Sequence, residues 1–259
     1  MRRGLSSSPF RVTRPGARFG MLTPSSNTVL EPVTAAMLAD WPSVTAHFGR
    51  FKVTEIALSD QALRQFDDSE ILRAAELLAH AKVDIIAWNG TSASWLGFDR
   101  DERLIERITA ATGIKACTCV LGYREIFERT AVSRVGLVSP YTDDVQSKIK
   151  ANWGTAGFHV TAERHTGLSD NFAFAEVTEV EIESMVRAVA ADGCDAIAIL
   201  CTNMRGARIA ARLEAELSLP IYDSVAVTLW ACLNRLRLET APLANWGQVF
   251  QLSQTTTPT

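Results

Sequence analysis

The sequence predicts an α/β protein with two pseudo-symmetric halves, each a parallel sheet flanked by helices, and a functional site in the cleft between them. Two observations support this fold class. Short apolar segments alternate with segments of helical length through most of the 259 residues, which is typical of parallel sheets covered by helices. Three sequence patterns of the first half also recur, in the same order, in the second. We expect the halves at 18–130 and 131–250, with tails at 1–17 and 251–259.

The clearest repeat joins two apolar strands and the polar loops that follow them. DIIAWNGTS begins at Asp84 and DAIAILCTN begins at Asp195, a shift of 111 positions that aligns Gly90 with Cys201. The three repeated pairs are 84–92 with 195–203, 18–27 with 134–143, and the weaker pair 114–118 with 219–223. Because all three recur in one order at nearly one offset, they indicate a duplicated unit.

In the first half, each predicted element has a local reason. An apolar face and an acidic or serine cap predict the helix that begins at Asp68 or Ser69. Pro32 is compatible with the first turn of the preceding helix. The predicted elements are strand 18–22, helix 31–39, strand 44–48, helix 68–82, strand 83–88, helix 101–112, strand 114–118 and helix 122–130.

The second half repeats this plan. The apolar run from Ala196 to Leu200 is typical of a parallel strand buried on both faces, and Thr178 is a suitable helix cap. The predicted elements are strand 135–139, helix 143–153, strand 158–162, helix 178–191, strand 195–200, helix 206–217, strand 220–223 and helix 226–238.

Composition excludes several classes of protein. The net charge of −3 gives no basic surface for nucleic acid, and no apolar run approaches the roughly 18 residues of a membrane span. Five cysteines without framework spacing indicate free thiols in a reducing compartment, so we expect a cytoplasmic protein. The arginine-containing segment 1–17 lacks the apolar stretch of a secretory signal.

Polar residues follow the predicted strands where ligands bind in open α/β sheets. Their side chains are neutral hydrogen-bonding groups and one thiol, which can exchange a proton. Donors around an oxyanion with one protonatable sulfur suit chemistry that passes through an enolate, and a thiol acting as base would need a lowered pKa. These residues are Ser25, Ser26, Asn27, Thr91, Ser92, Tyr141, Cys201, Thr202 and Asn203. A small buried cysteine at a strand end is the structural alternative for Cys201.

Other site types have little support. Cys117 and Cys119 are expected to face one side of a strand as core residues, and nothing nearby completes a metal site. No phosphate-binding or dinucleotide-binding glycine motif is present, so we expect neither a metal nor another cofactor. His165 is the one candidate partner for a Cys201–His pair. Trp88 and Trp95 are expected in the core, with a substrate wall as the alternative.

The loops PSSNT (24–28), GTS (90–92), PYTDD (140–144) and CTN (201–203) resemble those of the Asp/Glu racemase superfamily. Within it, they are most similar to the branch that holds maleate cis-trans isomerases and arylmalonate decarboxylases. The resemblance spans 18 to about 238 and implies cofactor-independent catalysis in a cleft between two α/β halves. Family members place a cysteine at the end of each duplicated strand: racemases use both thiols as acid and base, and maleate isomerases use the first as a nucleophile.

This chain has Gly90 at the first cysteine position and retains Cys201 at the second. That arrangement resembles arylmalonate decarboxylase, in which the single cysteine protonates an enediolate after carbon dioxide leaves. The resemblance implies that Cys201 donates the proton and that Thr91, Ser92 and Tyr141 hold the retained carboxylate. The leaving carboxylate would lie against apolar residues.

Other residues resemble the maleate isomerase branch. Asn27, with Ser25 and Ser26 beside it, and the pair Thr202–Asn203 are expected to bind a dicarboxylate. The first hypothesis is therefore a decarboxylase of a small dicarboxylate. The alternatives are an isomerase or racemase, including a catabolic relative of ectoine-utilisation type, and a non-catalytic dicarboxylate-binding module. Assembly into a homo-oligomer is left open.

Overall fold

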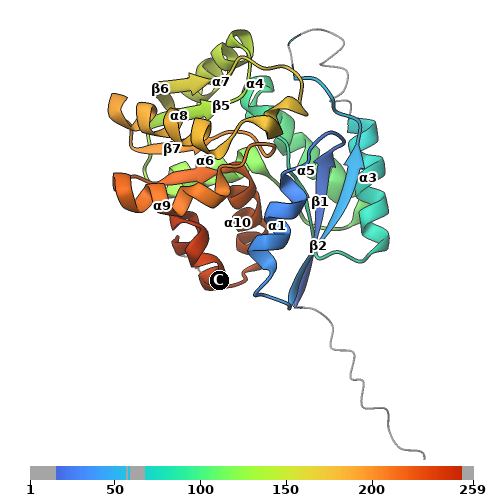
Figure 1. Cartoon of the computed structure of the whole chain (residues 1–259). Coiled ribbons are helices and arrows are strands. Elements are labelled where there is room, and N and C mark those ends of the chain that lie inside the picture. Colours follow the sequence, from blue (N-terminus) through green and yellow to red (C-terminus); the bar gives the residue numbers. More distant parts are fainter. Residues whose placement is uncertain (1–15, 57, 59–67, 253–259) are drawn as a thin grey trace, which may run out of the picture.

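The structure is a computed structural model that describes residues 16–56, 58 and 68–252. It contains two four-stranded parallel sheets, one in each half of the chain (Figure 1). The first sheet consists of β1 (Ala17–Pro24), β2 (Val44–Phe51), β3 (Ile85–Trp88) and β4 (Ala116–Thr118). The second consists of β5 (Arg134–Ser139), β6 (His159–His165), β7 (Ala196–Ile199) and β8 (Ile221–Asp223). The strand orders, β2-β1-β3-β4 and β6-β5-β7-β8, are equivalent, which confirms the predicted fold class.

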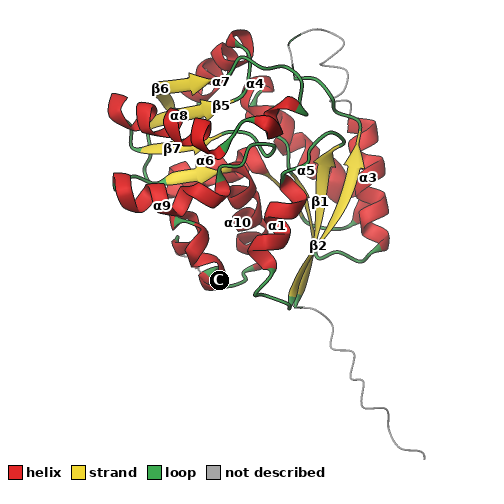
Figure 2. Ribbon diagram, in the orientation of Figure 1, coloured by secondary structure: helices red, strands yellow, loops and turns green. Residues whose placement is uncertain are grey.

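Helices pack around both sheets (Figure 2). Those of the first half are α1 (Leu30–Leu38), α3 (Asp68–His80), α4 (Ala93–Leu96), α5 (Phe98–Thr112) and α6 (Cys119–Arg129). Those of the second half are α7 (Asp143–Thr155), α8 (Glu179–Asp192), α9 (Ala207–Leu217) and α10 (Ser224–Leu236). Three 3₁₀ helices complete the described elements, namely η1 (Ala173–Glu176), η2 (Ala241–Trp246) and η3 (Gln248–Gln251).

The two halves are joined by packed helices. α10 contacts α6, β3 and β4 of the first half, and α4 contacts α7 of the second. Gly122 allows α6 to approach α10 closely, because a Cβ at this position would lie 2.9 Å from Cγ1 of Val227. The halves therefore share one continuous apolar core, and the carboxyl ends of their central strands lie at a common cleft.

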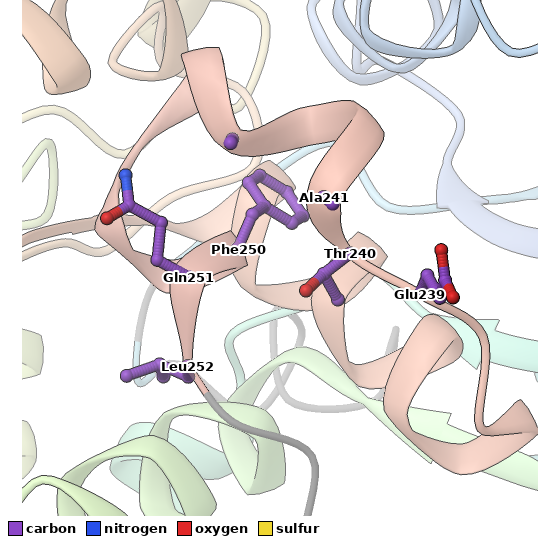
Figure 3. A pocket seen from close by; sticks show the side chains of 7 residues that line it. Glu239, Thr240, Ala241, Phe250, Gln251 and Leu252 are labelled. Atoms are coloured by element: carbon purple, nitrogen blue, oxygen red, sulfur yellow. The ribbon is translucent and has the colours of Figure 1, made fainter.

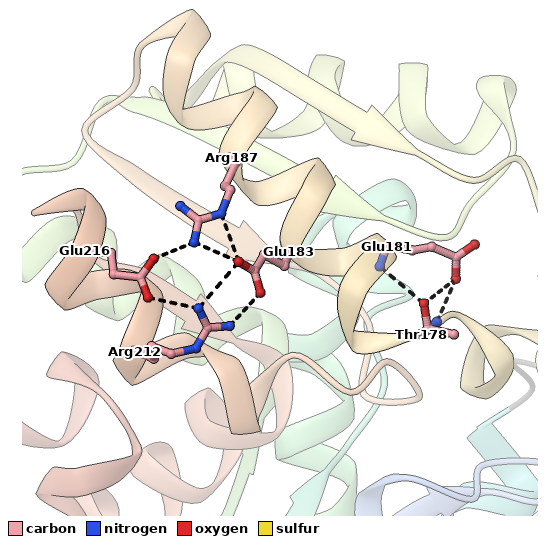
Figure 4. Close-up of polar contacts among 6 residues, drawn as sticks. All are labelled: Thr178, Glu181, Glu183, Arg187, Arg212 and Glu216. Atoms are coloured by element: carbon pink, nitrogen blue, oxygen red, sulfur yellow. Dashed lines mark hydrogen bonds and ion pairs between the residues drawn. The ribbon is translucent and has the colours of Figure 1, made fainter.

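Most predicted elements are present within two or three residues of their expected bounds, and helix caps set several of the ends. Thr178 caps α8 through a capping box with Glu181 (Figure 4). Thr118 accepts a hydrogen bond from the backbone N–H of Leu121 and starts α6 three residues earlier than predicted. The prediction that Cys119 shares a strand with Cys117 is therefore wrong, because Cys119 is the first residue of that helix.

No element is predicted after residue 238, where the structure has η2 and η3. Ala17 and Gln251, both expected in tails, instead begin β1 and end η3. The remaining expected tail segments, 1–15 and 253–259, lie outside the described residues. Over the described part of the chain, no helix has the length and apolar character needed to cross a membrane.

Candidate active site

A small cavity lies between the two halves, beside the carboxyl ends of β1, β3, β5 and β7. Its volume is about 20 Å³, which is little more than one water molecule requires. The side chains that line it are uncharged and come from both halves. They are Pro24, Val53, Ile56, Trp88, Gly90, Thr91, Ser92, Trp95, Tyr141, Asn171, Cys201 and Thr202.

Cys201 lies two residues after the end of β7 and is 3% exposed. Its Sγ accepts a hydrogen bond from the backbone N–H of Asn203 at 3.3 Å. Burial raises the pKa of this thiol to about 12, although the hydrogen bonds from Asn203 and from the Tyr141 side chain act in the opposite direction. The thiol is therefore protonated near neutral pH, which suits a proton donor better than a base. A base at this position would instead need a thiol with a lowered pKa.

Two hydroxyl groups meet across the cleft. Oγ1 of Thr91, in the loop after β3, lies 2.5 Å from the hydroxyl oxygen of Tyr141, in the loop after β5. Burial raises the pKa of Tyr141 well above its usual value, so the phenol stays neutral and can donate a hydrogen bond. Ser92 lines the same cavity. It immediately precedes α4, but its side chain makes no capping hydrogen bond to the first turn of that helix. The three hydroxyls could hold a carboxylate without a cation.

The predicted substrate-binding residues occupy two different places. Thr202 lines the cavity, and its hydroxyl donates to the Asn89 carbonyl at 2.8 Å while accepting from Nδ2 of Asn27 at 3.1 Å. Asn203 is fully buried behind it. Its Oδ1 accepts from the N–H of Thr28 at 2.9 Å, and its Nδ2 donates to the Asn171 carbonyl at 2.5 Å.

Asn27, Ser25 and Ser26 also lie behind the cavity wall. Oδ1 of Asn27 accepts the N–H groups of Val29 and Leu30 where α1 begins. The hydroxyls of Ser25 and Ser26 both donate to the Val53 carbonyl, at 3.3 and 2.7 Å. These three residues therefore support the loop around the cavity, and their role toward a substrate stays a prediction.

Part of the cavity wall is formed by residues that were not predicted from the sequence. Val53, Ile56 and Asn171 lie in the segments that follow β2 and β6. These segments pair with each other across the cavity, since the N–H of Ile56 donates to the Ser169 carbonyl and the N–H of Asn171 donates to the Thr54 carbonyl. Glu55 and Asp170 form an antiparallel bridge there. Their separation of 115 positions is close to the offset of 116 between 18–27 and 134–143, so the bridge joins corresponding segments of the two halves. The repeated sequence patterns do not include these segments, and no motif marks them.

The competing sites do not assemble. His165 lies outside the cavity wall, with Nδ1 2.8 Å from Oε2 of Glu163 and Nε2 2.7 Å from Oδ1 of Asp143. Cys117 and Cys119 are buried, and the Sγ atoms of Cys117 and Cys232 are 3.7 Å apart. Among the described residues, no group of three or more His, Cys, Asp or Glu side chains could hold a metal ion.

A larger pocket of about 390 Å³ lies between η2 and η3 (Figure 3). Glu239 provides the one ionisable side chain in its wall, and Phe250 and Leu252 provide its larger apolar surfaces. The pocket contains no thiol and no cluster of hydrogen-bond donors from different elements. Its greater volume therefore does not make it the better candidate for catalysis.

Comparisons with known proteins agree with this geometry. The chain is 26% identical to a maleate isomerase of Pseudomonas putida over 234 residues, covering 86% of this chain and 92% of that enzyme. It is 24% identical to the arylmalonate decarboxylase of Bordetella bronchiseptica over 214 residues, covering 82% and 87%. Maleate isomerase is the more frequent name among the matching relatives.

A solved structure shows the same fold. It is the Nocardia farcinica maleate cis-trans isomerase, a Cys-to-Ser mutant with a covalently bound succinylcysteine intermediate. The TM-score is 0.81 at 19% identity, with 92% of this chain and 99% of that chain covered. The sequence model of the arylmalonate decarboxylase family matches residues 27–250. The match spans most of the sequence, every strand except β1 and the whole cavity wall except Pro24, and the chain therefore belongs to the arylmalonate decarboxylase family.

Proposed function

We propose that this protein decarboxylates a small malonate-type dicarboxylate, with Cys201 as the proton donor. The observation that supports this most strongly is that one buried, protonated thiol lies at the cavity. All five cysteines lie in the described part of the chain, and Cys201 is the one that lines the cavity. A buried, protonated thiol can deliver a proton to carbon without a second thiol.

The proposed reaction has two steps. The bond between the α-carbon and one carboxylate breaks, carbon dioxide leaves, and the electron pair stays on the substrate as an enediolate. Thr91, Ser92 and Tyr141 donate hydrogen bonds to the enediolate oxygens, where negative charge increases. The Cys201 thiol then transfers its proton to the α-carbon, and the resulting thiolate recovers a proton from water.

The apolar part of the wall supports the first step. Pro24, Val53 and Ile56 line the cavity together with two tryptophans. A carboxylate placed against them loses its hydration, and its conversion to neutral carbon dioxide removes the charge. Because the cavity is smaller than any dicarboxylate, the proposed reaction requires the cavity to widen when substrate binds.

Isomerisation of a maleate-type substrate is the second candidate. Two observations favour it. Most of the matching relatives are named maleate isomerase, and the sequence has the pattern of Asn27, Thr202 and Asn203 that resembles that branch. In this mechanism a thiolate adds to the double bond, the carbon–carbon bond rotates, and the thiolate leaves. The high pKa of Cys201 disfavours the thiolate that this addition requires.

Proton NMR in D₂O distinguishes these reactions. Purified protein is given phenylmalonate and, separately, maleate. We expect loss of carbon dioxide from phenylmalonate with incorporation of one deuterium at the α-carbon, abolished in Cys201→Ala and retained in the matched control Cys194→Ala, whose thiol lies outside the cavity. Fumarate from maleate would instead establish the isomerase. Binding of either acid without turnover would favour a binding module.

A further inference from the structure

Gly90 occupies the position of the first cysteine in related enzymes that have two catalytic thiols. The structure gives a steric reason why this chain has glycine there. A Cβ built on Gly90 would lie 1.8 Å from Cζ2 and 2.3 Å from Cε2 of Trp88. Real Cβ atoms essentially never approach other heavy atoms below 3.0 Å. Gly90 is also absent from the glycines with positive φ. The Trp88 indole, and not the backbone conformation, therefore excludes larger residues at position 90, because a negative φ is accessible to L-residues.

The indole is held in this place from several sides. Trp88 is the last residue of β3, is 1% exposed, and pairs in register with Leu22 of β1 and Thr118 of β4. Its ring centroid lies 5.2 Å from that of Phe51, the last residue of β2. The next residue, Asn89, is fixed because its backbone N–H and its Nδ2 both donate to the Leu22 carbonyl at 3.1 Å. A side chain at position 90 would therefore have to displace the indole from its contact with Phe51.

We propose that Trp88 is a specificity-determining residue. Its indole leaves no space for a thiol side chain at position 90, so Cys201 stays the single proton donor in the cavity. The steric part of this proposal stands alone, and its chemical consequence rests on the proposed decarboxylase function. With one thiol, the α-carbon of the enediolate receives its proton from one side, which gives one enantiomer of product. A second thiol at position 90 could donate to, or remove a proton from, the other side. That thiol can be accommodated only when the indole is removed.

A double-mutant cycle on thermal unfolding tests the steric part. Gly90→Ala adds one methyl group and should lower the Tm by roughly 5 °C in the presence of Trp88, as expected for overpacking. In the Trp88→Leu background, which keeps an apolar side chain in the core, the same substitution should change the Tm by less than about 2 °C. The matched control background is Trp95→Leu, which alters another tryptophan of the same cavity and should leave the full decrease. An equal decrease in all three backgrounds would overturn the proposal.

The chemical consequence is tested with α-methyl-α-phenylmalonate and chiral analysis of the 2-phenylpropanoate formed. The wild type should give one enantiomer. Trp88→Leu/Gly90→Cys should give both, and should show one additional alkylated thiol by intact mass, whereas Trp95→Leu/Gly90→Cys should do neither. A single enantiomer from the first double variant, with its new thiol alkylated, would contradict the role of Trp88 in restricting proton transfer. If the wild type decarboxylates no malonate, the proposed function fails, and the unfolding cycle still decides whether Trp88 blocks position 90.

Discussion

At the scale of single residues, the cavity presents hydroxyl groups and a protonated thiol, with no cationic side chain in its wall. An anion bound there is stabilised by neutral donors held at fixed positions, which is how oxyanion sites act in a water-excluded environment. Thr91 and Tyr141 are central because each comes from a different half of the duplicated fold. The Tyr141 ring also packs edge-on against Trp95 and Phe174, with centroids 5.2 and 5.6 Å away.

Tyr141→Phe isolates the contribution of one donor. The ring and its packing remain, so we expect a stable protein whose kcat falls by roughly 10²-fold, with a smaller change in KM. Initial rates of carbon dioxide release measure this effect. The matched control is Tyr222→Phe, which removes a hydroxyl that interacts with Thr130 outside the cavity. A Tyr141→Phe variant within twofold of the wild-type kcat would exclude this hydroxyl from transition-state stabilisation.

The sequence predicts those site residues that stand in motif loops at strand ends. Cys201, Gly90, Thr91, Ser92, Tyr141 and Thr202 all line one cavity. It does not distinguish them from residues such as Asn203, whose buried amide bonds to the backbone of Thr28 and Asn171. The steric relation between Trp88 and Gly90 is also invisible in the sequence, because it depends on the rotamer of the indole.

At the scale of elements, helix caps determine where the structure departs from the predicted bounds. Thr118 and Asp223 occupy equivalent positions in the two halves, and each caps the helix that follows its strand. Arg237 adopts a left-handed conformation, with φ 55°, and ends α10 two residues before its predicted end. The 3₁₀ helices η2 and η3 are too short to produce a helical hydrophobic period, so pattern analysis could not predict them.

α8 provides a test of the capping energy. Thr178→Ala removes the side-chain acceptor for the N–H of Glu181 and the hydroxyl that bonds to its carboxylate. We expect a decrease of about 1 kcal/mol in the free energy of unfolding, measured by urea denaturation. Val180→Ala, in the same first turn and 77% exposed, is the control and should change stability by less than about 0.5 kcal/mol. Equal effects of the two substitutions would mean that the cap contributes nothing.

Two exposed arginines and two glutamates link the same helix to α9 (Figure 4). Glu183 lies between Arg187 and Arg212, and Glu216 contacts both arginines. Hydrogen bonds from the arginines lower the pKa of Glu183 to about 2. Because these groups are in contact with water, salt screens their attraction, and the ion pairs contribute little to the stability of the contact between α8 and α9.

At the scale of the whole molecule, each half contains a buried carboxyl group. Asp101 of α5 and Asp223 at the end of β8 are both fully buried, and Oδ2 of each has no hydrogen-bond partner in the described part of the chain. Burial raises the pKa of each group to about 7. Asp223 caps α10 through its other oxygen, which accepts from the N–H groups of Val225 and Ala226.

These carboxyls make the free energy of unfolding depend on pH in a defined direction. Between about pH 4 and pH 7 the folded chain retains protons that the unfolded chain releases, so their contribution to stability decreases as pH rises through this range and is constant above it. Asp223→Asn removes one such group while keeping an acceptor for the cap. The free energy of unfolding of the variant minus that of the wild type should therefore be larger at pH 8 than at pH 5, by roughly 2 kcal/mol. Urea denaturation at the two pH values measures this difference. Asp192→Asn, which removes an exposed carboxylate paired with Arg164, is the matched control for the loss of one carboxyl group, and a gain of the same size in both variants would contradict the proton retained by Asp223.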